Sequence, residues 1–195
     1  MPDSSSETIV KYLVVLFACL WGGVEVFRQA GQRTQGRDTR DDRGSLALLY
    51  ACITLGYSIA IPVSFSRYGR LDWGRPYWLV CGVLLIGAGL WIRRSAVRTL
   101  GPFFTCEVGV EAHQPLVDAG LYRRIRHPGY LGQLLVFLGI GLALVNWISV
   151  VSLFLPVLVA FSRRMAVEEK LLQKHFGAQY DGYRARTRRL IPGIY

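Results

Sequence analysis

The sequence predicts an all-α, polytopic membrane protein with about five transmembrane helices and a cytoplasmic C-terminal helix. The chain has 195 residues, of which 52% are hydrophobic and 18% are charged. Soluble globular domains contain about 25% charged residues, so this chain is poor in charge. It is nevertheless basic, with a net charge of +10 and a mean hydropathy of +0.30. This combination excludes a disordered chain and favours a membrane protein over a nucleic-acid-binding domain.

Three apolar segments in the first half are long enough to cross a bilayer as helices, namely residues 9–27, 46–65 and 77–92. The first follows a leader that contains Asp3 and Glu7 instead of the basic residues of a secretory signal. We therefore interpret it as a span rather than a signal peptide. The third contains glycines that would let another helix approach closely: Gly82, Gly87 and Gly89.

Residues 130–161 form the longest apolar segment, with 32 residues. A single helix of this length would measure about 48 Å, which exceeds the thickness of one bilayer core. The polar Asn146 lies in the middle of the segment. The sequence therefore predicts a tight hairpin of two spans, at about 130–145 and 148–162.

The basic residues of this five-span arrangement gather on one side of the membrane. Segments 28–45, 93–129 and 163–195 together hold 19 of the 23 Lys and Arg residues. Loops rich in Lys and Arg face the cytoplasm. We therefore expect an N-terminus outside and a C-terminus in the cytoplasm, and no nucleic-acid partner.

Polar residues that suit a site occur in the two cytoplasmic segments beside the hairpin. Pro128 favours a helix start and disfavours the α conformation for His127, which then lies at a helix N-terminus that attracts anionic groups. Tyr130 lies in the first turn of that helix. Arg164 and Glu168 are four residues apart and share one helix face. Each pattern alone also fits ordinary packing or a solvated helix surface.

Taken together, these residues carry a family resemblance. The string LVDAGLYRRIRHPGYLG, the apolar hairpin and the string RMAVEEKLLQKHFGAQYDGYRARTRRLIP follow one another in this order. This succession resembles the isoprenylcysteine carboxyl methyltransferase family and, more distantly, the membrane phospholipid N-methyltransferases. The resemblance covers about residues 99–192, whereas residues 1–98 match only as a set of spans.

The resemblance implies S-adenosyl-L-methionine as the methyl donor, in a cytoplasmic pocket near the membrane surface. It assigns Arg164 to the substrate and catalysis, and Glu168 to cofactor binding. Because the two residues can act together, both are candidates for the catalytic set. The other positions that resemble cofactor-binding residues are Gln114, Pro115, Leu116, Val117, Tyr122, His127, Pro128, Gly129 and Tyr130.

The chain departs from the family at two places. Gln114 stands where the family often has His, and Phe103 and Phe104 lie where it has Trp. These differences affect a cofactor hydrogen bond and the substrate entrance. We expect two functional parts, with three membrane helices in residues 1–98 and a methyltransferase core in residues 99–195.

Three functions remain open at this stage. Arg164 has the planar fork that orients a carboxylate, and a carboxylate acceptor needs no base because it is ionised at pH 7. An amine acceptor would need a base such as Glu168 or Glu169. The third possible function is that of a membrane scaffold with the same fold and no catalytic activity. We favour carboxyl O-methylation of a lipid or lipidated acceptor in the bilayer, with no obligate protein partner and no metal.

Overall fold

The computed structural model describes residues 4–33, 44–104 and 114–191, which contain no β-strand. The two 3-10 turns are Gly101–Phe103 and Gly120–Arg123. The helices are α1 (Ser4–Arg33), α2 (Ser45–Phe65), α3 (Arg75–Leu100), α4 (Pro128–Ala143), α5 (Trp147–Phe176) and α6 (Ala178–Arg186). The predicted all-α class is confirmed.

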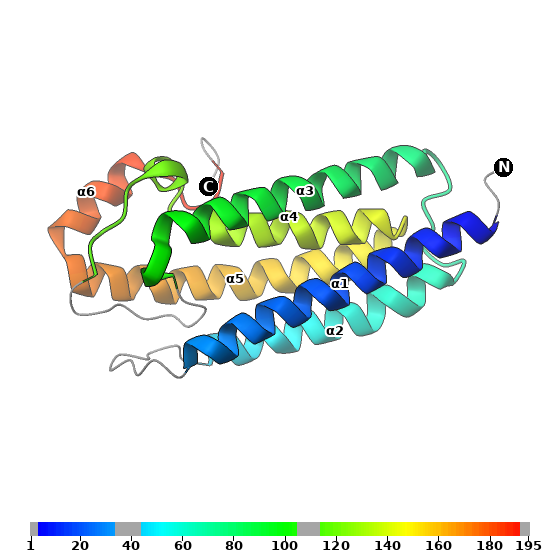
Figure 1. The fold of residues 1–195 in the computed structure, drawn as a ribbon, viewed down its shortest axis with the longest axis horizontal. Coiled ribbons are helices and arrows are strands. Elements are labelled where there is room, and N and C mark those ends of the chain that lie inside the picture. Colours follow the sequence, from blue (N-terminus) through cyan, green and yellow to red (C-terminus); the bar gives the residue numbers. More distant parts are fainter. Residues whose placement is uncertain (1–3, 34–43, 105–113, 192–195) are drawn as a thin grey trace.

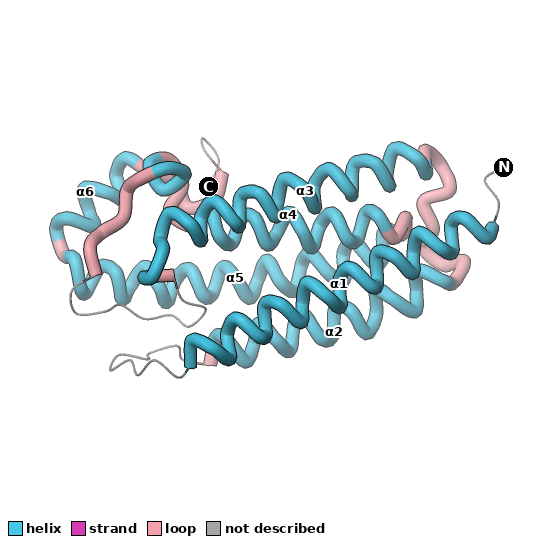
Figure 2. The backbone as a smooth tube through the Cα atoms, viewed as in Figure 1, coloured by secondary structure: helices cyan, strands magenta, loops and turns pink. Residues whose placement is uncertain are grey.

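Helices α1 to α5 run along the long axis of the molecule, and α6 lies at one end (Figure 1). The loop that carries the second 3-10 turn packs beside α6 at the same end, whereas the hairpin turn lies at the opposite end (Figure 2). Helices α1, α2, α3 and α5 contain stretches long and apolar enough to cross a membrane, and α4 is a shorter apolar helix. The chain is therefore a multi-pass membrane protein. Because α4 has 16 residues and is about 24 Å long, the number of crossings stays a prediction.

The predicted hairpin is confirmed, and Asn146 organises its turn. Its side-chain Oδ1 accepts hydrogen bonds from the backbone N–H groups of Ile148 and Ser149, at 2.9 and 3.2 Å. Its Nδ2 donates to the carbonyls of Val63 and Tyr68, at 3.2 and 2.7 Å. One buried amide therefore caps α5 and also fixes the connection between α2 and α3.

The last helix of the hairpin is longer than the predicted span, which ended at 162. It continues as α5 to Phe176, because the residues after the span are good helix formers and contain no Gly or Pro. Gly177, with a φ of 53°, ends the helix in a backbone conformation that favours glycine. The consequence is that Arg164 and Glu168 lie on the same rigid helix as the apolar segment.

Close packing of α3 on α4 depends on glycine. A Cβ atom on Gly89 would lie 2.5 Å from the carbonyl oxygen of Gly132, and one on Gly82 would lie 2.7 Å from the carbonyl oxygen of Gly139. Apart from its own stretch of helix, Gly87 has no atom within 4 Å of its Cβ position. Two of the three glycines noted in the sequence therefore allow the helices to touch, and this contact fixes the position of α4 against α3.

We predict opposite effects for alanine at two of these glycines. Gly89→Ala would place a methyl group against the α4 backbone and lower the free energy of unfolding by about 1–3 kcal/mol. Gly87→Ala meets open space and would raise helix propensity, a gain of up to about 1 kcal/mol. Thermal unfolding of the purified protein in detergent measures both. A similar fall in Tm for the two variants would contradict this packing.

Candidate functional site

A cavity of about 640 Å³ opens between the helices at the end of the bundle where α4 begins. This volume is within the range of about 300–1,000 Å³ that is typical of small-molecule sites. The aromatic side chains of Trp21, Tyr57 and Phe137 line its apolar part. His127 and Glu168 line its polar part. The cavity therefore has an amphiphilic lining.

Segments far apart in the sequence bring the predicted site residues to this one cavity. Pro128 is the exception, because it is buried as the first residue of α4 and does not line the cavity. The predicted residues that line the cavity are Gln114, Pro115, Leu116, Val117, Tyr122, His127, Gly129, Tyr130, Arg164 and Glu168.

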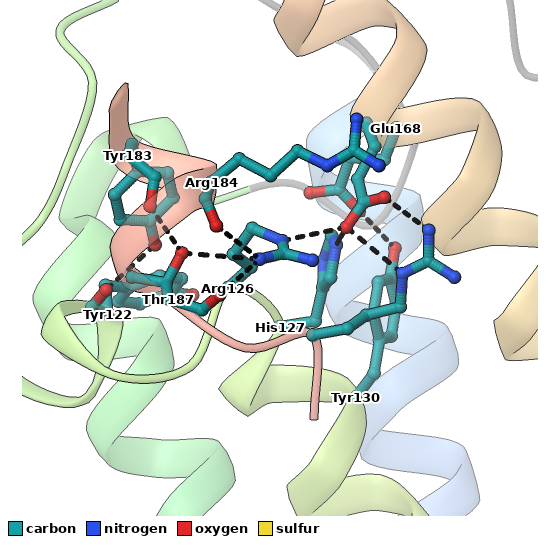
Figure 3. Close-up of polar contacts among 10 residues, drawn as sticks. Tyr122, Arg126, His127, Tyr130, Glu168, Tyr183, Arg184 and Thr187 are labelled. Carbon is teal, nitrogen blue, oxygen red and sulfur yellow. Dashed lines mark hydrogen bonds and ion pairs between the residues drawn. The ribbon is translucent and has the colours of Figure 1, made fainter. Parts of the chain in front are cut away.

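The start of α4 positions His127 and Tyr130 against Glu168. The His127 carbonyl accepts the backbone N–H groups of Tyr130 and Leu131, both at 3.1 Å. The Tyr130 hydroxyl donates to Glu168 Oε2 at 2.8 Å, and His127 Nδ1 lies 3.7 Å from the same oxygen (Figure 3). Glu168 keeps 33% of its side chain exposed. It is therefore held in place and still accessible to a ligand.

Glu169, the next residue, has a different environment. It accepts hydrogen bonds from the Nε atoms of Arg126 and Arg189, at 3.0 and 3.1 Å, and lies 3.3 Å from His127 Nε2. Its side chain is 8% exposed, and it does not line the cavity. The two neighbouring glutamates are thus distinct: Glu168 faces the cavity, and Glu169 joins three segments of the protein.

Arg126 and Tyr183 hold the C-terminal segment against the wall of the cavity. Arg126 Nη1 donates to the Thr187 carbonyl at 2.6 Å (Figure 3). The Tyr183 hydroxyl donates to the Tyr122 carbonyl at 2.9 Å. Burial raises the pKa of the Tyr183 hydroxyl above its ordinary value, so the hydroxyl stays a donor at neutral pH. Helix α6 therefore positions Tyr122.

Arg164 is almost fully buried, with 2% of its surface exposed, yet it lines the cavity. Its Nη1 donates to the Ser45 hydroxyl at 3.3 Å, at the first turn of α2. It lies one helical turn before Glu168 on α5. A guanidinium that lines the cavity in this position can bind an anionic group there.

Sequence reasoning missed an ion pair in the cavity wall. Glu25 of α1 and Arg93 of α3 both line the cavity, with Arg93 Nη2 3.0 Å from Glu25 Oε2. A charge within an apolar span is the signal that points to such a residue. Sequence reasoning also did not predict that Arg189 would contact Glu169, 20 residues earlier in the chain.

Comparisons with known proteins agree on a family. A family model described as "Phospholipid methyltransferase" matches residues 77–179. A probable protein-S-isoprenylcysteine O-methyltransferase of Oryza sativa subsp. indica is 35% identical over 124 residues, 62% of this chain and 65% of the relative. Protein-S-isoprenylcysteine O-methyltransferase A of Arabidopsis thaliana is 34% identical over 150 residues, 73% of this chain and 76% of the relative.

The fold also matches a solved structure. The eukaryotic intramembrane Ras methyltransferase ICMT (isoprenylcysteine carboxyl methyltransferase) aligns with a TM-score of 0.58 and 22% sequence identity. The alignment covers 82% of this chain and 55% of that chain. At this identity, the match shows a shared fold. The chain spans about two thirds of the rice relative and about half of the solved protein.

The environments of the paired glutamates predict different losses of stability. Glu169→Ala would leave Arg126 and Arg189 without their shared carboxylate, and we expect the free energy of unfolding to fall by about 3–5 kcal/mol. Glu168→Ala is the matched control: Glu168 is more exposed and accepts from the Tyr130 hydroxyl, so we expect a smaller loss of about 1–2 kcal/mol. Thermal unfolding measures both, and hydrogen exchange of residues 184–191 locates the change. Equal losses would mean that Glu169 does not join these segments.

Proposed function

The chain belongs to the family of the protein-S-isoprenylcysteine O-methyltransferases, and we propose that it is a membrane methyltransferase that uses S-adenosyl-L-methionine to methylate the carboxylate of a lipid-linked acceptor. One observation carries this proposal: Arg164 and Glu168, one turn apart on α5, face a single amphiphilic cavity together with His127 and Tyr130. The curated relatives are named for this reaction on isoprenylcysteine. A prenylcysteine-like group or another small amphiphilic acid is the acceptor class that the cavity suits.

The residues at the polar part of the cavity fit the donor. When bound, S-adenosyl-L-methionine supplies an electrophilic methyl group. Glu168, held by the Tyr130 hydroxyl at 2.8 Å, is placed to bind an ammonium or a ribose hydroxyl. Gly129 lines the cavity at the N-terminal, positive end of the α4 dipole, and this end favours a carboxylate. Residues 114–117 and Tyr122 form a wall suited to the adenosine.

Arg164 and the apolar part of the cavity fit the acceptor. A carboxylate is already ionised at pH 7, so it needs orientation rather than a base. The Arg164 guanidinium can bind both carboxylate oxygens. Trp21, Tyr57 and Phe137 line the part of the cavity that would accommodate an apolar tail. The family implies a lipidated partner for this reaction. We also propose that the site lies at the cytoplasmic surface of the membrane, because 19 of the 23 Lys and Arg residues lie on that side of the five-span arrangement.

A second candidate is methylation of a phospholipid amine, which the description of the matching family model favours. An amine must lose a proton, so this reaction needs a base. Glu168 lines the cavity, whereas Glu169 is occupied by Arg126 and Arg189. Of the two glutamates, Glu168 would have to serve as that base, and in this case Arg164 would have no carboxylate to orient.

The chemical stability of the product separates the two reactions. We expect the protein in nanodiscs with radiolabelled S-adenosylmethionine and N-acetyl-S-farnesylcysteine to form a methyl ester. Mild base releases labelled methanol from an ester, whereas an N-methyl group survives the treatment. Label that survives base, with phosphatidylethanolamine as the acceptor, would support the amine reaction and contradict our assignment.

Two conservative variants test the division of roles. Arg164→Lys keeps the charge but loses the planar fork, so we expect kcat to fall about 100-fold with little change in the Kd of S-adenosylhomocysteine. Glu168→Gln should instead weaken S-adenosylhomocysteine binding about tenfold, because it removes a charged hydrogen bond. Enzyme kinetics and calorimetry measure these quantities on variants with native Tm. Loss of cofactor affinity in both would show that the roles are not divided in this way.

A further inference from the structure

The buried ion pair between α1 and α3 has no part in the reaction as derived above. Arg93 Nη2 lies 3.0 Å from Glu25 Oε2, and the two side chains are only 9% and 16% exposed. Both residues belong to apolar helices long enough to cross a membrane. Removing two charges from water is costly, and charges within membrane helices usually serve a function. The position of the Glu25–Arg93 ion pair in the cavity wall indicates what its function is.

Arg93 connects the ion pair to the site. The Arg93 backbone lies against Gly132: a Cβ atom on Gly132 would be 2.7 Å from the backbone nitrogen of Arg93. The packing of α3 on α4 therefore fixes the position of Arg93. Its Nη1 lies 3.2 Å from the Cβ position of Gly129, two residues after His127. Its guanidinium also lies 4.9 Å from the centre of the Phe104 ring, a favourable cation–π distance. Arg93 is therefore a fixed point beside the cofactor-binding motif.

Helix α1, in contrast, is weakly packed. Only 17% of its apolar span is buried, compared with 22% for α2 and α3 and 33% for α5. Apart from its own stretch of helix, Gly22, which lines the cavity, has no atom within 4 Å of its Cβ position. Besides Glu25, α1 is anchored through Lys11, whose Nζ donates to the Ser64 carbonyl of α2 at 2.7 Å. The two anchors are about 21 Å apart along the helix, and Ala18, Cys19, Trp21 and Gly22 between them line the cavity.

We propose that Glu25 and Arg93 form a latch that holds α1 as the outer wall of the cavity, and that this latch positions the apolar tail of the acceptor. The second role, positioning the acceptor, rests on the proposed function. The first role, holding α1 in place, is independent of it. Releasing the pair lets α1 move away from α3 and α4, which widens the apolar part of the cavity toward the bilayer. The pair thereby acts on the acceptor through α1 and makes no contact with the reacting atoms.

The mechanical role is testable without an activity assay. Spin labels at Phe27→Cys on α1 and Arg98→Cys on α3, in a background with the native cysteines replaced by Ser, report the separation of the two helices. We expect Glu25→Gln and Arg93→Gln each to lengthen and broaden the distance distribution. The exchanged pair E25R/R93E should restore it, and Arg94→Gln, one residue away on the exposed face of α3, should leave it unchanged. Unchanged distances in both single variants, or no recovery in a folded exchanged pair, would overturn the latch.

Kinetics test the positioning role with N-acetyl-S-farnesylcysteine as the acceptor. We expect Glu25→Gln to raise the KM for this acceptor about tenfold while kcat and the Kd of S-adenosylhomocysteine stay nearly constant. A tenfold weaker Kd with unchanged distances would place the pair in the donor site and overturn the proposal. If the wild-type protein does not methylate this acceptor at all, the proposed function fails, and the distance measurement still decides the latch.

Discussion

The ionised carboxylate of Glu169 is the constraint on which the site-bearing end of the protein depends. It joins α5 to the loop before α4 through Arg126 and His127, and to the C-terminal segment through Arg189. A buried charge of this kind is stable only while its partners are present, because removing one leaves another charge uncompensated. The three segments therefore form a single unit. As a result, the cavity wall is rigid even though much of it consists of loops.

The hydropathy of the sequence was sufficient to predict the helices, the hairpin and the multi-pass character, because long apolar segments have few alternatives in a membrane. The end of α5 was missed because a drop in hydropathy ends a span but does not end a helix whose residues still favour helix formation. The different roles of Gly87 and Gly89 were also beyond prediction. They depend on which side of α3 faces α4, and a helix that is apolar on all sides does not reveal its rotation.

The candidate site was predictable where its residues form motifs. The four-residue spacing of Arg164 and Glu168, and the His-Pro at a helix start, placed these side chains on known faces. The contrast between Glu168 and Glu169 was not predictable, because it depends on where Arg189, 20 residues later, folds back. The Glu25–Arg93 pair joins residues 68 positions apart, and Arg93 lies among arginines that also indicate orientation. The expected division into residues 1–98 and 99–195 therefore reflects where the family motifs lie in the sequence. The cavity itself is lined by residues from both parts of the chain.

The two walls of the cavity differ in stiffness, and this difference suits the proposed reaction. Methyl transfer requires donor and acceptor to be held close together and aligned, so the polar wall must be preorganised. The Glu169 contacts and the glycine packing of α3 on α4 supply that rigidity. An acceptor with an apolar tail must also enter from the bilayer, which requires an element that opens at low cost. Helix α1 suits this requirement, because most of its surface faces outward and polar contacts near its two ends anchor it. Rigid alignment and entry of the acceptor thus rest on different elements, so one can change without loss of the other.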